Sequence, residues 1–274
     1  MIRIDGTIID IGSFPDGSML VKYDHHDESV FEDSAAITWN YENDREFIAL
    51  IYLVKHLREN DVRDIFLNMP YIPNARQDRV KNDDDVFTLK YFAELLNSLN
   101  LNRVEVLDPH SNVSTALINN IVVNTPEQYI VTAIAKICGR LSDWEVLRDS
   151  LLMFYPDEGA MKRYSGLIKL PYAFGIKKRN WETGIIEGLD VAGAVDQIAG
   201  KDILIVDDIC SRGGTFLHSA KKLKDLGAKD IYLYVSHCEN TILEGELLKG
   251  DLIKKVYTTD SIFTKSHEKV EVLK

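Results

Sequence analysis

The sequence predicts an α/β fold made of two tandem units, each a mostly parallel sheet flanked by helices. Short runs of apolar and β-branched residues alternate with amphipathic segments of helical period, which is typical of successive βα units. This series begins again near Thr125. We therefore expect one domain over residues 1–124 and a second over residues 125–274, because 274 residues suffice for two cores.

The first half begins with a β-rich stretch, after which Asn43 is an N-cap candidate and Glu46 completes a capping box. "DIFLNMP" (Asp64 to Pro70) and "NRVEVLD" (Asn102 to Asp108) predict strands, and the second strand leads directly to His110. Helical apolar stripes precede each of these strands. They are Phe47, Leu50, Ile51, Val54 and Leu57 in one helix, and Leu89, Phe92, Leu95, Leu96 and Leu99 in the next.

In the second half, Thr125 at the N-cap, Pro126 at N1 and Gln128 at N3 predict a helix start. "LLMFYPDEG" (Leu151 to Gly159) predicts a strand followed by a loop. "KDILIV" and "IYLYVSH" (Ile231 to His237) predict two more strands. The helix between them carries Phe216, Ala220 and Leu223 on one face and ends near Gly227.

Composition indicates a cytoplasmic, soluble protein rather than a nucleic-acid-binding or membrane protein. The net charge of −11 disfavours nonspecific nucleic-acid binding, which needs many cations against phosphates. No run of eighteen apolar residues occurs, and the start of the chain lacks a signal-peptide profile. Three widely spaced cysteines, Cys138, Cys210 and Cys238, fit a reducing compartment and argue against a disulfide framework or a zinc site.

The stretch "KDILIVDDICSRGGTF" (Lys201 to Phe216) carries the clearest chemistry. Ligands of parallel sheets gather beyond the carboxyl ends of strands, where a helix N-terminus offers free N–H groups. Asp207 and Asp208 are acceptors suited to sugar hydroxyls. In the following loop, Ser211, Arg212, Gly213, Gly214 and Thr215 supply hydroxyls, a cation and close backbone approach for a phosphate.

A purely structural interpretation makes Asp207 a strand-end carboxylate and the two glycines a turn. The complete string of strand, paired aspartates, short spacer, Gly-Gly-Thr and helix favours ligand binding instead. It resembles the signature of type I phosphoribosyltransferase-fold proteins. In those proteins the acidic pair holds ribose hydroxyls and the loop holds a 5-phosphate.

Further motifs in the same order resemble the ribose-phosphate diphosphokinases, which make phosphoribosyl diphosphate (PRPP). "PYIPNARQDR" (Pro70 to Arg79) is similar to their nucleotide-binding stretch, and "LDPHS" and "FPDGS" (Phe14 to Ser18) are similar to two shorter segments. "YPDEGAMKR" (Tyr155 to Arg163) and "KKR" (Lys177 to Arg179) are similar to a Pro-Asp-x-Gly segment and a catalytic loop. The resemblance implies two phosphoribosyltransferase-like domains, with ATP on the N-terminal side and ribose phosphate on the C-terminal side.

The resemblance also implies a role for each matching residue, and none of these roles follows from spacing alone. Lys178, Arg179 and His110 would be catalytic, and Asp207, Asp208 and positions 211–215 would bind ribose phosphate. Mg²⁺ would be served by His110 and Asp157. The ATP contacts would be Phe14, Asp16, Arg76, Gln77 and Arg79, with the adenine reached across a subunit interface, which implies a homo-oligomer, a dimer or higher.

The implied reaction is Mg²⁺-dependent transfer of the β,γ-diphosphoryl group of ATP to the anomeric hydroxyl of ribose 5-phosphate. Ser18 stands where a glutamate is usual, and "SRGGT" replaces Asp-Thr-Gly/Ala-Gly-Thr. Loss of that loop's acidic residue and gain of Arg212 would suit a bulkier acceptor with a second phosphate, such as ADP-ribose. A phosphoribosyltransferase and a non-catalytic synthetase-associated subunit remain as other interpretations.

Overall fold

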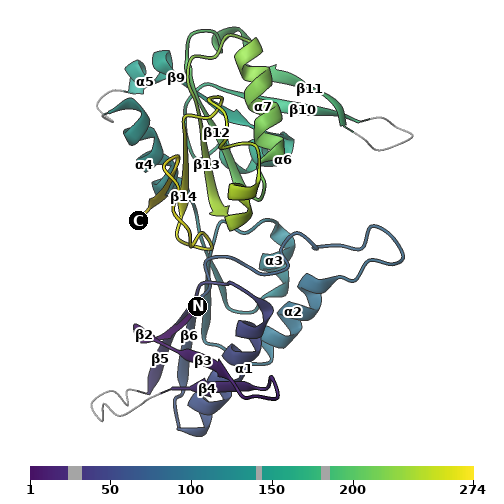
Figure 1. Cartoon of the computed structure of the whole chain (residues 1–274), viewed down its shortest axis with the longest axis vertical. Helices are drawn as coiled ribbons and strands as arrows, with labels where there is room; N and C mark the ends of the chain where they lie inside the picture. Colours follow the sequence, from purple (N-terminus) through teal and green to yellow (C-terminus); the bar gives the residue numbers. More distant parts are fainter. Residues whose placement is uncertain (24–32, 140–143, 180–185) are drawn as a thin grey trace. The chain divides into compact units, whose positions relative to one another are not determined.

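The protein is described by a computed structural model that covers residues 1–23, 33–139, 144–179 and 186–274. The chain divides into two compact units, Met1–Thr125 and Pro126–Lys274. Each unit has a sheet dominated by parallel strands and flanked by helices (Figure 1), which confirms the predicted fold class. None of the helices within the described ranges is long and apolar enough to cross a bilayer.

The main sheet of the first unit has the strand order β2-β1-β5-β6-β7-β8. The strands from β5 to β8 are parallel, and β1 runs antiparallel to both of its neighbours. A separate antiparallel hairpin joins β3 to β4. The bounds are β1 Ile2–Ile4, β2 Thr7–Ile8, β3 Asp10–Ser13, β4 Met19–Lys22, β5 Ser34–Trp39, α1 Asp44–Glu59, β6 Asp64–Asn68, α2 Thr88–Asn97, β7 Arg103–Leu107, α3 Asn112–Leu117 and β8 Ile121–Asn124.

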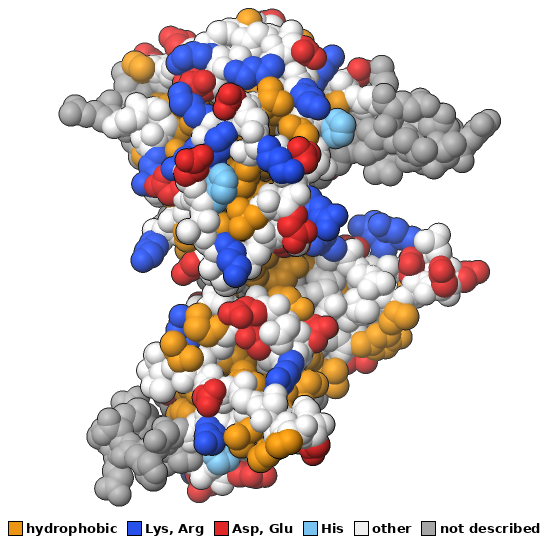
Figure 2. Space-filling model, viewed as in Figure 1, with side chains coloured by type: hydrophobic (Ala, Val, Ile, Leu, Met, Phe, Trp, Pro, Cys, Tyr) orange, Lys and Arg blue, Asp and Glu red, His pale blue; other side chains and the backbone are white. Residues whose placement is uncertain are grey.

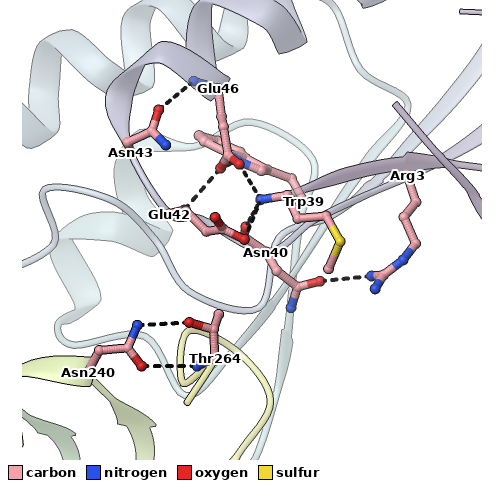
Figure 3. Close-up of polar contacts among 9 residues, drawn as sticks. Arg3, Trp39, Asn40, Glu42, Asn43, Glu46, Asn240 and Thr264 are labelled. Carbon is pink, nitrogen blue, oxygen red and sulfur yellow. Dashed lines mark hydrogen bonds and ion pairs between the residues drawn. The ribbon is translucent and has the colours of Figure 1, made fainter. Parts of the chain in front are cut away.

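Helix α1 begins at its predicted cap. The Asn43 side chain accepts a hydrogen bond from the Glu46 N–H at 3.3 Å, as a capping box requires. The buried Glu46 carboxylate instead accepts from Trp39 Nε1 at 3.0 Å and from the Glu42 N–H at 2.9 Å (Figure 3). These bonds tie the start of α1 to the end of β5.

Helix α2 buries most of its predicted stripe, with one error. Leu89, Phe92 and Leu96 are buried, whereas Leu95 is 52% exposed. Consecutive helical residues point about 100° apart, so Leu95 falls outside the face shared by the other three. Periodicity therefore located this helix correctly but set its buried face too wide.

The sheet of the second unit has the order β11-β10-β9-β12-β13-β14-β15, and only the β10–β11 pair is antiparallel. Alternate residues of its central strands join two apolar clusters, one with α7 and one with α4 and α6. Burial on both faces explains why these strands read as continuous apolar runs. The bounds are α4 Glu127–Cys138, α5 Trp144–Ser150, β9 Leu151–Tyr155, α6 Glu158–Tyr164, β10 Tyr172–Arg179, β11 Ile186–Gly193, η1 Val195–Gln197, β12 Asp202–Cys210, α7 Gly214–Asp225, β13 Ile231–Cys238, η2 Asn240–Glu244, β14 Lys255–Thr259 and β15 Val270–Leu273.

Two local predictions in the second unit are wrong. Helix α4 starts one residue late, because the Pro126 carbonyl accepts the first helical bond, from the Ile130 N–H at 3.0 Å, and Pro126 occupies the cap position. Gly159, expected in a loop, lies inside the short helix α6, which Asp157 caps. The sequence signal of a turn was in fact a helix start.

Candidate active site

Asp207 and Asp208 lie within β12 rather than after it, since the strand continues to Cys210. Asp207 pairs in register with Val235 of β13, and its carboxylate accepts from the Asp208 N–H at 3.0 Å. Burial, reinforced by the adjacent charge of Asp208, raises the pKa of Asp207 well above its ordinary value. The carboxylates of Asp207 and Asp208 therefore lie in different surroundings, although the two residues are adjacent in the chain.

Arg163 of α6 neutralises Asp208. Its guanidinium lies 3.2 Å from the Asp208 carboxylate, which is almost fully buried, and stacks near the Tyr164 ring at 5.7 Å. Arg163 ends the segment "YPDEGAMKR", but its place in the sequence alone predicts no role for it. Because β9 lies beside β12, the helix that follows β9 reaches the end of β12, and an arginine in that helix was the available signal.

Asp157 caps α6 by accepting from the Ala160 N–H at 3.1 Å. Its charge also contributes to the raised pKa of Asp207, after burial and Asp208, which places Asp157 at the same end of the sheet. Among the described residues, no group of three or more His, Cys, Asp or Glu side chains is arranged to hold a metal ion. The role of Asp157 toward Mg²⁺ stays a prediction.

The loop between β12 and α7 is shaped for close approach to its backbone. Gly213 has a φ of +77° and precedes Gly214, the first residue of α7. A Cβ on Gly213 would lie 2.7 Å from Leu247, whereas one on Gly214 would meet nothing within 4 Å. Gly214 and Thr215 are exposed, so the first N–H groups of α7 open outward from a backbone that only glycine adopts readily.

The polar residues of this loop are paired with carboxylates from the segment that follows β13. Ser211 Oγ donates to Glu239 Oε2 at 2.6 Å. Arg212, largely exposed, forms an ion pair with Glu244 at 3.1 Å. The loop itself lacks an acidic residue, but Glu239 brings a carboxylate beside it from the neighbouring strand end, which opposes the expected loss of repulsion toward a second phosphate.

In the first unit, the stretch "PYIPNARQDR", which we expect to bind ATP, is organised around Asp78, which was not predicted as a site residue. Asp78 is 4% exposed and receives Arg79 Nε at 2.9 Å and a second guanidinium nitrogen at 3.4 Å. Burial alone would raise the pKa of Asp78, but the hydrogen bonds and the charges of Arg79 and His110 outweigh it and lower the pKa. His110 is thus brought electrostatically close to "ARQDR".

Gln77 and Arg76, in the same stretch, differ from Arg79 in what their side chains contact. Gln77 accepts from Thr88 Oγ1 at 2.7 Å, at the start of α2, and Arg76 is exposed. Asn74 and Asp108 have φ values of +62° and +41°. Asn and Asp adopt this region more readily than other non-glycine residues, and Asp5, Asp61, Asn100 and Asn120 do so as well, so these two turns do not by themselves mark a ligand site.

Phe14 and Asp16 lie at the tip of the β3–β4 hairpin. Phe14 is 49% exposed, which is unusual for so large an apolar side chain. Asp16 accepts from both the N–H and Oγ of Ser18, at 2.9 and 2.6 Å, and these bonds lower its pKa. Arg45 of α1 donates to Ser13 Oγ at 2.6 Å, so α1 holds the hairpin directly beside its turn, where Ser13 pairs with Met19.

Lys178 and Arg179 end strand β10, and their side chains lie outside the described residues. The path of β10 is nevertheless fixed near the site. A Cβ on Gly175 would lie 2.6 Å from the Pro156 carbonyl oxygen, so this strand passes directly beside the residue preceding Asp157. The catalytic role of this pair stays a prediction.

No family model matches the chain. The chain is 29% identical over 237 residues to a ribose-phosphate pyrophosphokinase of Thermococcus kodakarensis, covering 84% of this chain and 77% of the relative. It is 26% identical to that of Saccharolobus solfataricus over 229 residues, covering 82% and 74%. Its fold is similar to a crystal structure of phosphoribosylpyrophosphate synthetase from Mycobacterium smegmatis, with a TM-score of 0.75, 20% identity, and coverage of 97% and 85%.

Proposed function

Because this chain is similar over most of its length to ribose-phosphate pyrophosphokinases, we propose that it belongs to that family and transfers the β,γ-diphosphoryl group of ATP to the anomeric hydroxyl of ribose 5-phosphate. The products are PRPP, a precursor in nucleotide synthesis, and AMP. One observation carries the proposal at the level of the site. The paired carboxylates near the end of β12, of which Asp208 is buried and Asp207 half-buried, lead through a positive-φ glycine into the N-terminus of α7, an arrangement that suits a sugar phosphate.

On the acceptor side, Asp207 and Asp208 accept from the ribose hydroxyls, and the ion pair with Arg163 holds the Asp208 carboxylate in place. The backbone at Gly213 and Gly214 and the Thr215 hydroxyl hold the 5-phosphate. Each of these groups is fixed by the sheet or by α7 before the substrate arrives. Positioning of this kind is what phosphoryl-group transfer mainly requires.

On the donor side, Arg76, Gln77 and Arg79 contact ATP, while Phe14 and Asp16 approach the adenine of a neighbouring subunit in a homo-oligomer. Lys178 and Arg179 close over the transferring group and neutralise its charge. Asp157 offers a carboxylate, which suits Mg²⁺, whereas the His110 imidazole suits ordering of a bound water. When bound, Mg²⁺ would supply charge neutralisation on the β- and γ-phosphates. We place the reaction in the cytoplasm.

ADP-ribose is the second candidate acceptor, and Arg212 is the observation in its favour. Its ion pair with Glu244 is exposed, and such pairs are weak enough for a phosphate to displace. Against this, Glu239 and Glu244 place two carboxylates beside the loop, which disfavours additional negative charge. We therefore rank ribose 5-phosphate first.

The test is to incubate the protein with Mg²⁺ and ATP, and with either ribose 5-phosphate or ADP-ribose, and to measure AMP. We expect AMP with ribose 5-phosphate. AMP with ADP-ribose alone would reverse the ranking of acceptors. AMP with neither acceptor would contradict the diphosphokinase proposal, and turnover of PRPP with a nucleobase would then indicate a phosphoribosyltransferase.

A further inference from the structure

The loop that follows β12 is joined to the residues that follow β13. Cys210 and Cys238 are paired in register at the ends of these two parallel strands, so Ser211 and Glu239 emerge side by side. Glu239 Oε2 accepts from Ser211 Oγ at 2.6 Å and from Thr241 Oγ1 at 3.0 Å. The Glu239 N–H donates to the Cys210 carbonyl at 2.8 Å, so backbone and side chain make the same connection.

The same segment, Glu239–Leu247, which we call the brace, also shapes the backbone of the loop. A Cβ on Gly245 would lie 2.0 Å from the Arg212 carbonyl oxygen, so only glycine fits there. Leu247 is buried against Gly213, at the residue whose φ is +77°. Contacts of the brace therefore fix three consecutive loop residues ahead of α7.

The brace is itself anchored at its first turn. Asn240 donates through its side-chain amide to Thr264 Oγ1 at 2.9 Å and accepts from the Thr264 N–H at 3.1 Å (Figure 3). Glu239 therefore lies between the end of β13 and Asn240, whose side chain is fixed by Thr264. A carboxylate placed in this way makes its hydrogen bonds without first losing rotamer freedom.

The chemistry explains why a carboxylate is tolerated near an anion site. Hydrogen bonds from hydroxyls to an ionised carboxylate are short and about twice as strong as neutral ones. Two of them reach one oxygen of Glu239 and partly compensate its negative charge. The net effect is a loop whose conformation is set before phosphate binds.

We propose that Glu239 is the positioning residue of the acceptor loop and sets the affinity of the protein for the phosphorylated acceptor. This proposal rests on the proposed function of the loop at positions 211–215. Glu239 acts through Ser211 and does not touch the reacting atoms. Its loss should therefore raise the Kd and KM for ribose 5-phosphate while leaving the KM for ATP nearly unchanged.

The first test compares Glu239→Ala and Glu239→Gln by calorimetric binding of ribose 5-phosphate and by steady-state kinetics. We expect Glu239→Ala to weaken acceptor binding about tenfold, and Glu239→Gln about threefold because its amide oxygen still accepts one hydroxyl. Glu246→Gln is the matched control, since exposed Glu246 pairs only locally with Lys249 at 2.8 Å. Unchanged acceptor affinity in both Glu239 variants would overturn the proposal.

The second test exchanges the two side chains. Ser211→Glu alone sets two carboxylates face to face and should weaken acceptor binding more than Glu239→Ala does. Ser211→Glu combined with Glu239→Ser restores one carboxylate and one hydroxyl with the same combined length, and should regain part of the affinity. A double variant no better than Ser211→Glu would contradict the proposal, and the contrast holds even if Glu239→Ala folds poorly.

These outcomes separate failure of this proposal from failure of the proposed function. Calorimetry with ribose 5-phosphate and with inorganic phosphate reports binding to the loop whether or not AMP is formed. Weaker binding in the Glu239 variants without AMP formation would sustain the positioning role and reject the kinase. Normal AMP formation by the Glu239 variants, with an unchanged KM for the acceptor, would support the kinase and contradict the positioning role.

Discussion

Asp207 is a residue at which function opposes stability. Its carboxylate lies half-buried near the end of β12, beside the buried carboxylate of Asp208, which forms an ion pair with Arg163. The pKa of Asp207 is raised by burial and by that neighbouring charge. Such an arrangement is kept where the carboxylate is needed for a ligand rather than for folding.

We expect Asp207→Asn to abolish acceptor binding and yet to increase the free energy of unfolding at neutral pH by about 1 kcal/mol. Because the folded-state pKa is raised, the stabilising effect of the protonated form is fully present below the unfolded-state pKa of about 3.9 and is lost as pH rises through the folded value. The difference between variant and wild type should therefore shrink as pH falls. Chemical denaturation at several pH values measures this.

The control for that measurement is Asp202→Asn, at an aspartate of the same strand that pairs with Lys229 at the sheet's other end. It should not stabilise the protein. Equal stability of wild type and Asp207→Asn at neutral pH would show that Asp207 carries no unfavourable charge.

At the scale of single residues, the sequence reveals candidate site residues that are neighbours along the chain. It does not reveal residues that are distant along the chain and become neighbours only in the folded protein. Asp207, Asp208 and the two glycines share one stretch, so their pattern is readable. Arg163 and Glu239 each come from a neighbouring strand end, and no spacing in the sequence relates them to β12. Their roles depend on the strand order β9-β12-β13, which becomes available only with the fold.

At the scale of elements, α7 is held by its buried face and by a glycine at its start. Phe216, Ala220 and Leu223 are buried against the sheet, as the periodicity predicts. Gly213 supplies the positive φ that turns the chain from β12 into the helix, and Leu247 fills the space where a side chain would lie. Helix and loop therefore form one structural element.

We expect Gly213→Ala to lower the free energy of unfolding by about 2 kcal/mol or more, because a left-handed alanine costs roughly 1–2 kcal/mol before the contact with Leu247 is added. Gly214→Ala is the matched variant, since its new Cβ meets nothing within 4 Å. Thermal unfolding of both proteins checks the difference. Equal destabilisation would mean that the contact and the φ of Gly213 do not matter.

The helices and strands that were predicted best are those in which buried residues recur with a regular period along the chain. The stripe of α1 and the continuous apolar runs of β12 and β13 follow directly from packing. Helix α6 was missed because its seven residues are too few to show a period and its Asp-Glu-Gly start resembles a turn. The Asp157 cap, visible only through its bond to Ala160, was the deciding feature.

At the scale of the whole molecule, acidic and basic side chains lie interspersed on the face shown in Figure 2. The net charge of −11 is therefore not gathered into one field on that face. The acceptor loop nevertheless combines a helix N-terminus with Arg212. Binding of a small anion by an acidic protein depends on such local groups rather than on net charge.

The β3–β4 hairpin is the feature most relevant to assembly. Phe14 is exposed in the turn of this hairpin, beside Ser13, which Arg45 of α1 binds, and the family resemblance gives this turn to the adenine site of a neighbouring subunit. If so, Phe14 and Lys178 of one active site belong to different chains. Two variants, each defective in one of these residues, then complement each other.

We expect Phe14→Ala and Lys178→Ala to lose most activity separately and to recover about a quarter of wild-type activity when mixed and re-associated as dimers. Half of the dimers are then mixed, and one of their two sites is intact. The control mixes Phe14→Ala with the double variant Phe14→Ala/Lys178→Ala, which leaves no intact site under any pairing. AMP formation measures recovery, and its absence in the first mixture would place Phe14 and Lys178 in the same chain's site or outside the reaction.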